Sequence, residues 1–105
     1  MLESKFKKET IERIKKRFRD LDLDFIDTHN RSMPDIFVIG PWSWAALEFK
    51  RSKLAAQQAQ QPNQIREFAD QEYHIIRLNR KGYAAFVFPE NLEEVLDDLE
   101  GVFSS

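Results

Sequence analysis

Residues 34–50, with the sequence PDIFVIGPWSWAALEFK, contain two apolar runs separated by a short turn. The first run, Ile36–Ile39, consists of β-branched and aromatic residues, which favour strands. It ends at Gly40-Pro41, where the chain is expected to turn, and the second run covers residues 44–50. This pattern predicts a β-hairpin with its turn at residues 40–43.

The segments on either side of this hairpin have patterns of their own. Apolar residues at helical spacing predict an amphipathic helix from Glu3 to about Leu21, with a basic outer face. A weak strand pattern covers 24–28, and the Ala/Gln-rich stretch 55–61 is expected to be a loop or a frayed turn. Further on, we expect a helix over 63–72, strands over 74–78 and 83–88, and a last helix that opens at residues 89–91. The order α-β-β-β-α-β-β-α predicts an α/β fold in which helices flank a small mixed sheet, with residues 1–105 as a single domain.

The composition excludes several classes of protein. Cysteine is absent, so disulfide scaffolds, thiolate zinc sites and cysteine nucleophiles are excluded. The longest stretch without a charged residue, 36–47, has twelve residues, whereas a membrane-spanning helix needs about 20. The first residues do not have the layout of a secretory signal. We therefore expect a cytoplasmic protein without a membrane segment.

Charge is balanced in total and uneven along the chain. The formal net charge is −2, but residues 1–19 carry eight Lys or Arg against three Glu, a local charge of +5. Residues 50–81 carry a local charge of +4, and residues 90–101 a local charge of −6. The acidic segment offsets the basic ones, so the net charge does not exclude a polyanionic partner. Solvated helix faces at each end of the chain are the alternative interpretation.

Two acids and a lysine are expected to meet at one end of the hairpin. A hairpin places the start of its first strand beside the end of its second, so Asp35 should lie near Glu48 and Lys50. Alternate residues of a strand share a face, so Glu48 and Lys50 project together while Phe49 faces the other way. A hard cation such as Mg²⁺ would use such carboxylates, and the backbone carbonyl of Phe49 could add a ligand. Lys50 would then orient or deprotonate an attacking water, which suits phosphodiester hydrolysis. The alternative is a surface aspartate at a strand entry with an edge-strand Glu–Lys pair.

The order of elements resembles the core of the PD-(D/E)XK nuclease superfamily, which has the restriction-endonuclease-like fold. The surrounding sequence is similar to one branch of it, the small phage-type VRR-NUC proteins, and the similarity extends from Glu3 to about Leu99. It is carried by five short stretches: Glu3-Ser4-Lys5-Phe6, Met33-Pro34-Asp35, Trp44-Ala45-Ala46-Leu47-Glu48-Phe49-Lys50, Gln61-Pro62-Asn63-Gln64 and Phe88-Pro89-Glu90-Asn91.

The resemblance implies a role for each residue of the site. Asp35 and Glu48 would be metal ligands and Lys50 the catalytic lysine. Glu3 matches the N-terminal glutamate that completes the acidic site of the family, with Glu9 and Glu12 of this chain as rivals for that role. Gln64 matches a glutamine on the following helix and would contact water or phosphate during catalysis. The implied cofactor is Mg²⁺, with Mn²⁺ as a substitute, and no small-molecule cofactor is expected.

The function expected from this resemblance is a metal-dependent DNA endonuclease that selects DNA structure, such as a Holliday junction or other branched DNA. Paired nicks at a junction require two active sites, so a homodimer is expected. If the chain is phage-encoded, it would act in the cytoplasm of the host cell. Four basic residues would contact phosphates without reading sequence: Arg31, Arg51, Lys53 and Arg66.

Two other functions remain open at this point. One is a non-catalytic nucleic-acid-binding module that has a nuclease-like fold, although a pure binder gains nothing from carboxylates that face phosphates. The other is a nicking or flap nuclease that works within a larger DNA-processing complex.

Overall fold

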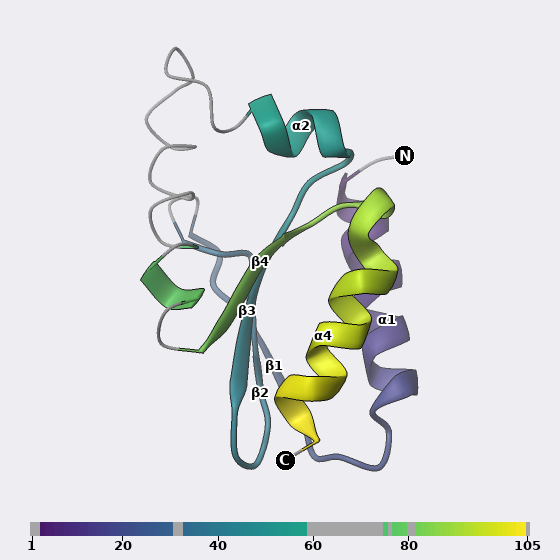
Figure 1. Ribbon diagram of the computed structural model, residues 1–105, viewed down its shortest axis with the longest axis vertical. Helices are drawn as coiled ribbons and strands as arrows, with labels where there is room; N and C mark the ends of the chain where they lie inside the picture. Colours follow the sequence, from purple (N-terminus) through teal and green to yellow (C-terminus); the bar gives the residue numbers. More distant parts are fainter. Residues whose placement is uncertain (1–2, 31–32, 59–74, 76, 80–81, 105) are drawn as a thin grey trace.

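The structure, a computed structural model, describes residues 3–30, 33–58, 75, 77–79 and 82–104 (Figure 1). The chain starts with helix α1, followed by a meander of three strands and helix α2, and it ends with a fourth strand and helix α4. The bounds are α1 Glu3–Arg17, β1 Asp24–Asp27, β2 Ile36–Ile39, β3 Trp44–Phe49, α2 Lys53–Gln58, β4 Tyr83–Val87, the 3-10 turn η1 Pro89–Asn91 and α4 Leu92–Phe103.

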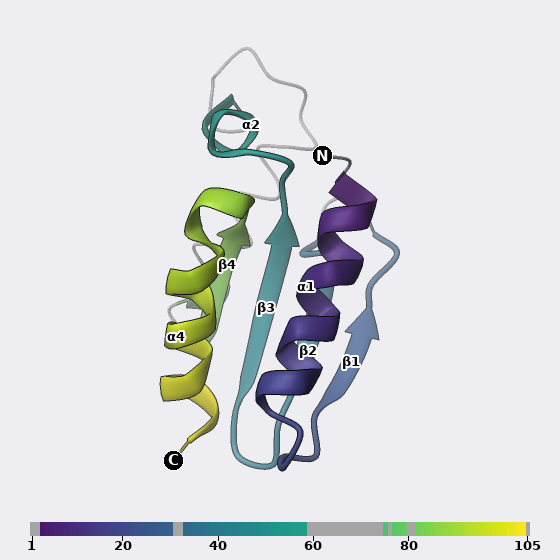
Figure 2. The same ribbon diagram turned by 90° about the vertical axis from the view of Figure 1, so that its right-hand side faces the viewer.

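The four described strands form one mixed sheet in the order β1-β2-β3-β4. The pairs β1–β2 and β2–β3 are antiparallel, and β3–β4 is parallel. Figure 2 shows α1 and α4 side by side on one face of this sheet. The expected mixed α/β class, with helices beside a small mixed sheet, is confirmed.

The main core lies between this face of the sheet and the two helices. Alternate residues of β2 and β3 point into it, and α1 and α4 contribute one apolar stripe each. Its buried members are Phe6, Ile14, Phe18, Ile36, Val38, Ala45, Leu47, Phe49, Val87, Val95, Leu96, Leu99 and Phe103. A smaller cluster, Ala46, Ile75 and Ala84, lies apart from the main one. Residues 46 and 84 belong to the opposite face of the sheet by strand alternation.

Most of the expected elements are present, with small differences in their ends. The strands at 24–28, 36–39, 44–50 and 83–88 are confirmed within one residue. The first helix begins at Glu3 as predicted, but it ends at Arg17, and the chain then turns with a hydrogen bond from Leu21 N–H to Phe18 O of 3.0 Å. The helix expected over 63–72 lies outside the described residues.

The strand expected over 74–78 is wrong, because the described residues there, Ile75 and 77–79, are helical. Ile75 and Leu78 are three residues apart, a spacing that puts both on one side of a helix. Ile75 is 7% exposed and packs in the small cluster with Ala46 and Ala84, with Leu78 against it. Two apolar residues at this spacing fit either element, and the small side chains of the sheet leave room for a helix.

The loop expected over 55–61 is also wrong for the residues described, because α2 covers Lys53–Gln58. The Ser52 hydroxyl accepts a hydrogen bond of 3.1 Å from Ala55 N–H, which is an N-cap contact. Ala, Leu and Gln are good helix formers once a cap fixes the first turn. Within the described residues, no helix is both long and apolar enough to cross a membrane.

Candidate functional site

Asp35 lies at the entry to β2, directly beside the end of β3. The pairing of Ile36 with Leu47 continues by one residue, which sets Asp35 opposite Glu48. The Asp35 carboxylate accepts a hydrogen bond of 2.8 Å from Phe49 N–H at Oδ2. Its own backbone carbonyl accepts a bond of 3.1 Å from Thr28 N–H. Contacts from β3 and from the end of β1 therefore hold Asp35 in place.

Glu48 and Lys50 are buried at the same end of the sheet, with exposed fractions of 1% and 5%. Phe49 between them packs into the main core, edge-on against Phe6 of α1 with ring centroids 6.0 Å apart. Strand alternation places Glu48 and Lys50 on the opposite face. Lys50 N–H donates to Val87 O at 2.8 Å, which ties this end of β3 to β4. The structure thus brings together Asp35, Glu48 and Lys50, as the hairpin pattern predicts.

The Glu48 carboxyl group lies against Asp35. Burial first, and then the hydrogen bond and the charge of Asp35, together raise the pKa of Glu48 to about 10, although Lys50 lowers it. Glu48 therefore keeps its proton near neutral pH. The Glu48 Oε2 atom is buried and has no hydrogen-bond partner in the part of the chain that the structure describes. A buried carboxylate oxygen without a partner is costly and calls for a ligand.

Glu3, in the first turn of α1, approaches the same site. Burial raises its pKa above the ordinary value, Lys50 lowers it, Asp35 raises it, and Arg51 and Lys7 lower it. Glu3 is therefore within electrostatic reach of Asp35 and Lys50. Its rivals Glu9 and Glu12 are exposed and lie further along α1, away from its N-terminal end.

The donors of this site fit a hard divalent cation bound by few protein ligands. Among the residues that the structure describes, no three His, Cys, Asp or Glu side chains lie close enough together to hold a metal ion. Mg²⁺ commonly uses one or two carboxylates, several waters and the substrate phosphate. Asp35 and Glu48 supply two carboxylates, and the unpartnered Oε2 of Glu48 is a free acceptor. The N–H and C=O of one strand residue leave the same edge, so the Phe49 carbonyl lies on the side of Asp35. The roles of these residues in metal binding remain predictions.

Two of the four basic residues predicted to contact DNA lie within the described chain. Arg51 is exposed and close enough to Glu3 to lower its pKa. Lys53 is exposed at the start of α2. Arg31 and Arg66 lie outside the described residues, and so does the predicted catalytic Gln64.

Sequence reasoning missed the residues that hold the corner after β3. The Glu90 carboxylate accepts a hydrogen bond of 3.0 Å from Lys53 N–H. The side chain of Asn91 accepts a bond of 2.9 Å from Phe88 N–H and donates one of 2.9 Å to Phe86 O. These contacts connect β4 and η1 to the start of α2, three residues after Lys50. The Pro-Glu-Asn stretch ahead of a helix was the signal, because Glu and Asn there are free to bind backbone groups nearby.

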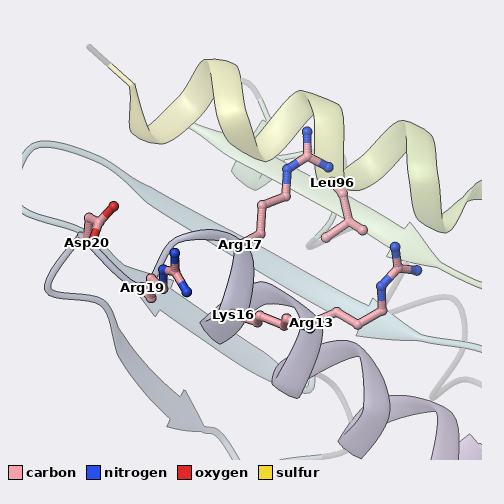
Figure 3. Close-up of a pocket in the computed structure, with 6 residues that line it drawn as sticks. All are labelled: Arg13, Lys16, Arg17, Arg19, Asp20 and Leu96. Carbon is pink, nitrogen blue, oxygen red and sulfur yellow. The ribbon is translucent and has the colours of Figure 1, made fainter.

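A separate open pocket of about 600 Å³ lies between the C-terminal half of α1 and α4 (Figure 3). Figure 3 shows Arg13 and Arg17 extending from α1 toward α4. Arg13 pairs with Glu93 at 2.7 Å, and Arg17 pairs with Asp97 at 2.9 Å and also with Glu100. The acids of α4 neutralise Arg13 and Arg17, so these ion pairs join the two helices across the pocket. Lys16, Arg19 and Asp20 also line it.

Comparison of the chain with known protein families, with curated proteins and with solved structures finds no match. The resemblance to the VRR-NUC nucleases stays a prediction from the sequence.

Proposed function

We propose that the chain is a metal-dependent endodeoxyribonuclease that hydrolyses phosphodiester bonds, with the restriction-endonuclease-like fold of the VRR-NUC branch. The observation that carries this proposal is the buried pair Glu48 and Lys50 beside the half-buried Asp35, with the Glu48 Oε2 atom unpartnered among the described residues. A carboxyl pair and a lysine are costly to bury together. Binding a cation and a phosphate offsets this cost, whereas a role in folding alone does not.

Each residue has a distinct role in the proposed reaction. Asp35 and Glu48 would hold Mg²⁺ or Mn²⁺, with Glu3 and the Phe49 carbonyl at the edge of the site. A cation bound there would supply stabilisation for the charge that develops on the phosphate. Lys50 orients the attacking water and takes part in moving its proton. The Phe49 N–H holds Asp35 in position through the 2.8 Å hydrogen bond. Gln64 is proposed to contact water or phosphate from the following segment.

The proposed substrate is branched DNA, a Holliday junction above all, recognised by shape. Arg31, Arg51, Lys53 and Arg66 contact phosphates, which position DNA without reading its sequence. A two-fold homodimer supplies the two active sites that paired nicks require.

A cleavage assay tests this function. It compares a four-way junction, a flap, single strands and linear duplex with Mg²⁺, with Mn²⁺ and with a chelator. Asp35→Ala and Lys50→Ala are run in parallel, after circular dichroism has confirmed that both variants fold. We expect metal-dependent cutting of the junction, reduced at least about a hundredfold in both variants.

Three other outcomes would change the proposal. Equal cutting of every substrate keeps the nuclease and removes the selectivity for branched DNA. A preference for the flap, or a single nick in duplex, favours a nicking or flap nuclease. No cutting, with DNA binding that survives both substitutions, contradicts the enzyme and favours a binding module.

A further inference from the structure

The basic residues of α1 fall into two groups that the structure separates. Three of them are neutralised by acids on neighbouring elements. Arg13 and Arg17 pair with acids of α4, and Lys7 pairs with Asp27 of β1 at 2.8 Å. These three cations connect α1 to the rest of the fold.

The second group faces solvent. Its members are exposed, and they form no ion pair with any residue in the described part of the chain. We refer to this group as the α1 basic face: Lys5, Lys8, Lys15 and Lys16 of α1, with Arg19 in the turn that follows the helix. Two exposed acids, Glu9 and Glu12, lie on the same helix, so the surface keeps a charge of about +3 after they are counted. Lys15 also rests over the Phe25 ring, with Nζ 5.2 Å from its centroid.

The α1 basic face begins in the first turns of α1, at the end of the molecule where β3 also ends (Figure 2). Lys5 lies two residues after Glu3, so the two side chains point to different sides of the helix. Lys8 and Lys15 also line an open groove of about 320 Å³, together with Ser4, Lys7, Ile11 and Glu12. From Lys5 to Lys16 the helix rises about 16 Å. A duplex of that length has about five base pairs and roughly nine phosphates.

We propose that the α1 basic face binds the phosphate backbone of one duplex arm that flanks the cleaved bond. The inference rests on the proposed function, and it adds a second phosphate-binding surface to the basic residues near Lys50. Several exposed cations along one helix, without an ion pair among the described residues, favour a long polyanion. Long, flexible lysine side chains suit contacts to the phosphate backbone rather than to bases. The α1 basic face would contact about five base pairs of this arm, beginning at the site, whatever the sequence of the arm.

Two triple variants of the full chain test the proposal, because each removes three charges from the same helix. The face variant carries Lys5→Gln, Lys8→Gln and Lys16→Gln. The matched control carries Lys7→Gln, Arg13→Gln and Arg17→Gln, which remove the paired cations. Binding of a fluorescein-labelled duplex is measured by anisotropy in a chelator, which prevents cleavage, over a series of salt concentrations.

We expect the face variant to bind duplex at least about tenfold more weakly than wild type, with a salt slope lower by about 0.9 for each lost contact. The control should keep the wild-type slope and lose thermal stability. Shortening the labelled arm below about five base pairs should remove the difference between the face variant and wild type.

Other results would overturn the proposal. They are a face variant that binds like wild type, equal losses in both variants, or no duplex binding by wild type. Loss of binding to phosphatidylserine vesicles in the face variant, with duplex binding unchanged, would assign the face to a membrane surface instead. If wild type cuts DNA in the presence of metal and the face variant binds duplex as wild type does, the proposed nuclease activity is retained. Only the proposed role of α1 in DNA binding is then refuted.

Discussion

At the scale of single residues, the site holds its acids at a cost to stability. Glu48 is buried against Asp35, and its Oε2 atom has no hydrogen-bond partner. Lys50 on the same strand offsets part of this cost, and Glu3 adds to it. An unpaired buried acceptor costs about 1–3 kcal/mol, and more when it is charged. Such a cost at the end of a strand is typical of a functional site. Binding of a ligand there recovers the free energy that is lost when these groups are buried on folding.

This cost should make the stability of the protein depend on pH. Burial and Asp35 raise the pKa of Glu48 from 4.5 to about 10, so the folded state binds one more proton than the unfolded chain between these values. The contribution is fully present below pH 4.5 and is lost as the pH rises toward 10. The contribution of Glu3 to the pH dependence of stability has the same sign, since its pKa is also raised. We expect the metal-free protein to lose stability from pH 5 to pH 9 in urea unfolding.

Glu48→Gln removes this titration and keeps the shape of the side chain. It should raise stability at pH 9 by about 2 kcal/mol and flatten the profile between pH 5 and pH 9. Glu94→Gln, at an exposed position of α4, is the matched control and should leave the profile as in wild type. A Glu48→Gln profile that parallels wild type would contradict the raised pKa of Glu48.

Part of this site could be predicted from residue spacing. The two-residue period of a strand and the geometry of a hairpin suffice to place Asp35 beside Glu48 and Lys50. The approach of Glu3 could not be derived in this way, because it depends on how α1 packs across the sheet, and it came from the resemblance alone. Residue spacing also could not predict that the side chains of Glu48 and Lys50 are buried, or that the Glu48 Oε2 atom lacks a partner among the described residues. Both depend on the surrounding packing.

At the scale of elements, the corner between β3 and α2 is held by side chains from a distant segment. Ser52 caps the helix at Ala55 N–H, and Glu90 binds Lys53 N–H. Since the corner begins right after Lys50, these caps also limit how far the end of β3 can move. The resemblance drew attention to Glu90 without giving it a role.

Glu90→Ala should loosen this corner without unfolding the protein. Loss of a cap costs about 1 kcal/mol, so hydrogen exchange at the Lys53 amide should speed up by about fivefold while amides of β3 keep their protection. Glu93→Ala is the control, since its partner is Arg13 on α1. Unchanged exchange at Lys53 in Glu90→Ala would show that the contact contributes nothing.

Element types were predictable where the pattern was long or strongly alternating. Strands β1 to β4 and both long helices follow from periodicity and from turn residues such as Gly40-Pro41. The error at 74–78 arose because Ile75 and Leu78 fit both a strand and a helix, and only the partner surface of Ala46 and Ala84 decides between them. The error at α2 came from reading an Ala/Gln composition as loop while overlooking the Ser52 cap.

At the scale of the whole molecule, long-range pairing sets the fold. β4 joins the sheet parallel to β3, with Ala45 opposite Tyr83 and Phe49 opposite Val87. The chain between β3 and β4 must therefore cross over to return in the same direction. No local pattern gives the strand order, because it depends on which apolar faces meet in three dimensions. The order predicted from the residue pattern had one more strand, over 74–78, than the described residues show.

Ion pairs between α1 and α4 add a charge-dependent contact to this packing. Arg17 binds Asp97 and Glu100, which also raise the pKa of its guanidinium. These side chains are exposed, so their attraction is screened by salt. Arg17→Gln should lower the melting temperature slightly at low salt, and the difference from wild type should disappear at high salt. Lys16→Gln, one residue away without an ion pair, is the control. A difference that persists at high salt would point to lost packing instead.

The central claim is that Asp35, Glu48 and Lys50 together hydrolyse a phosphodiester with a divalent cation. The most direct test is the single-turnover rate of cutting one labelled four-way junction as Mg²⁺ is raised from zero. It is measured for wild type, Asp35→Asn, Lys50→Met and the control Asp24→Asn, which alters an exposed aspartate at the start of β1. We predict a rate that depends on Mg²⁺ in wild type and control and falls at least about a hundredfold in the two site variants. Cutting that needs no metal, or that survives in folded Asp35→Asn and Lys50→Met, would contradict this assignment.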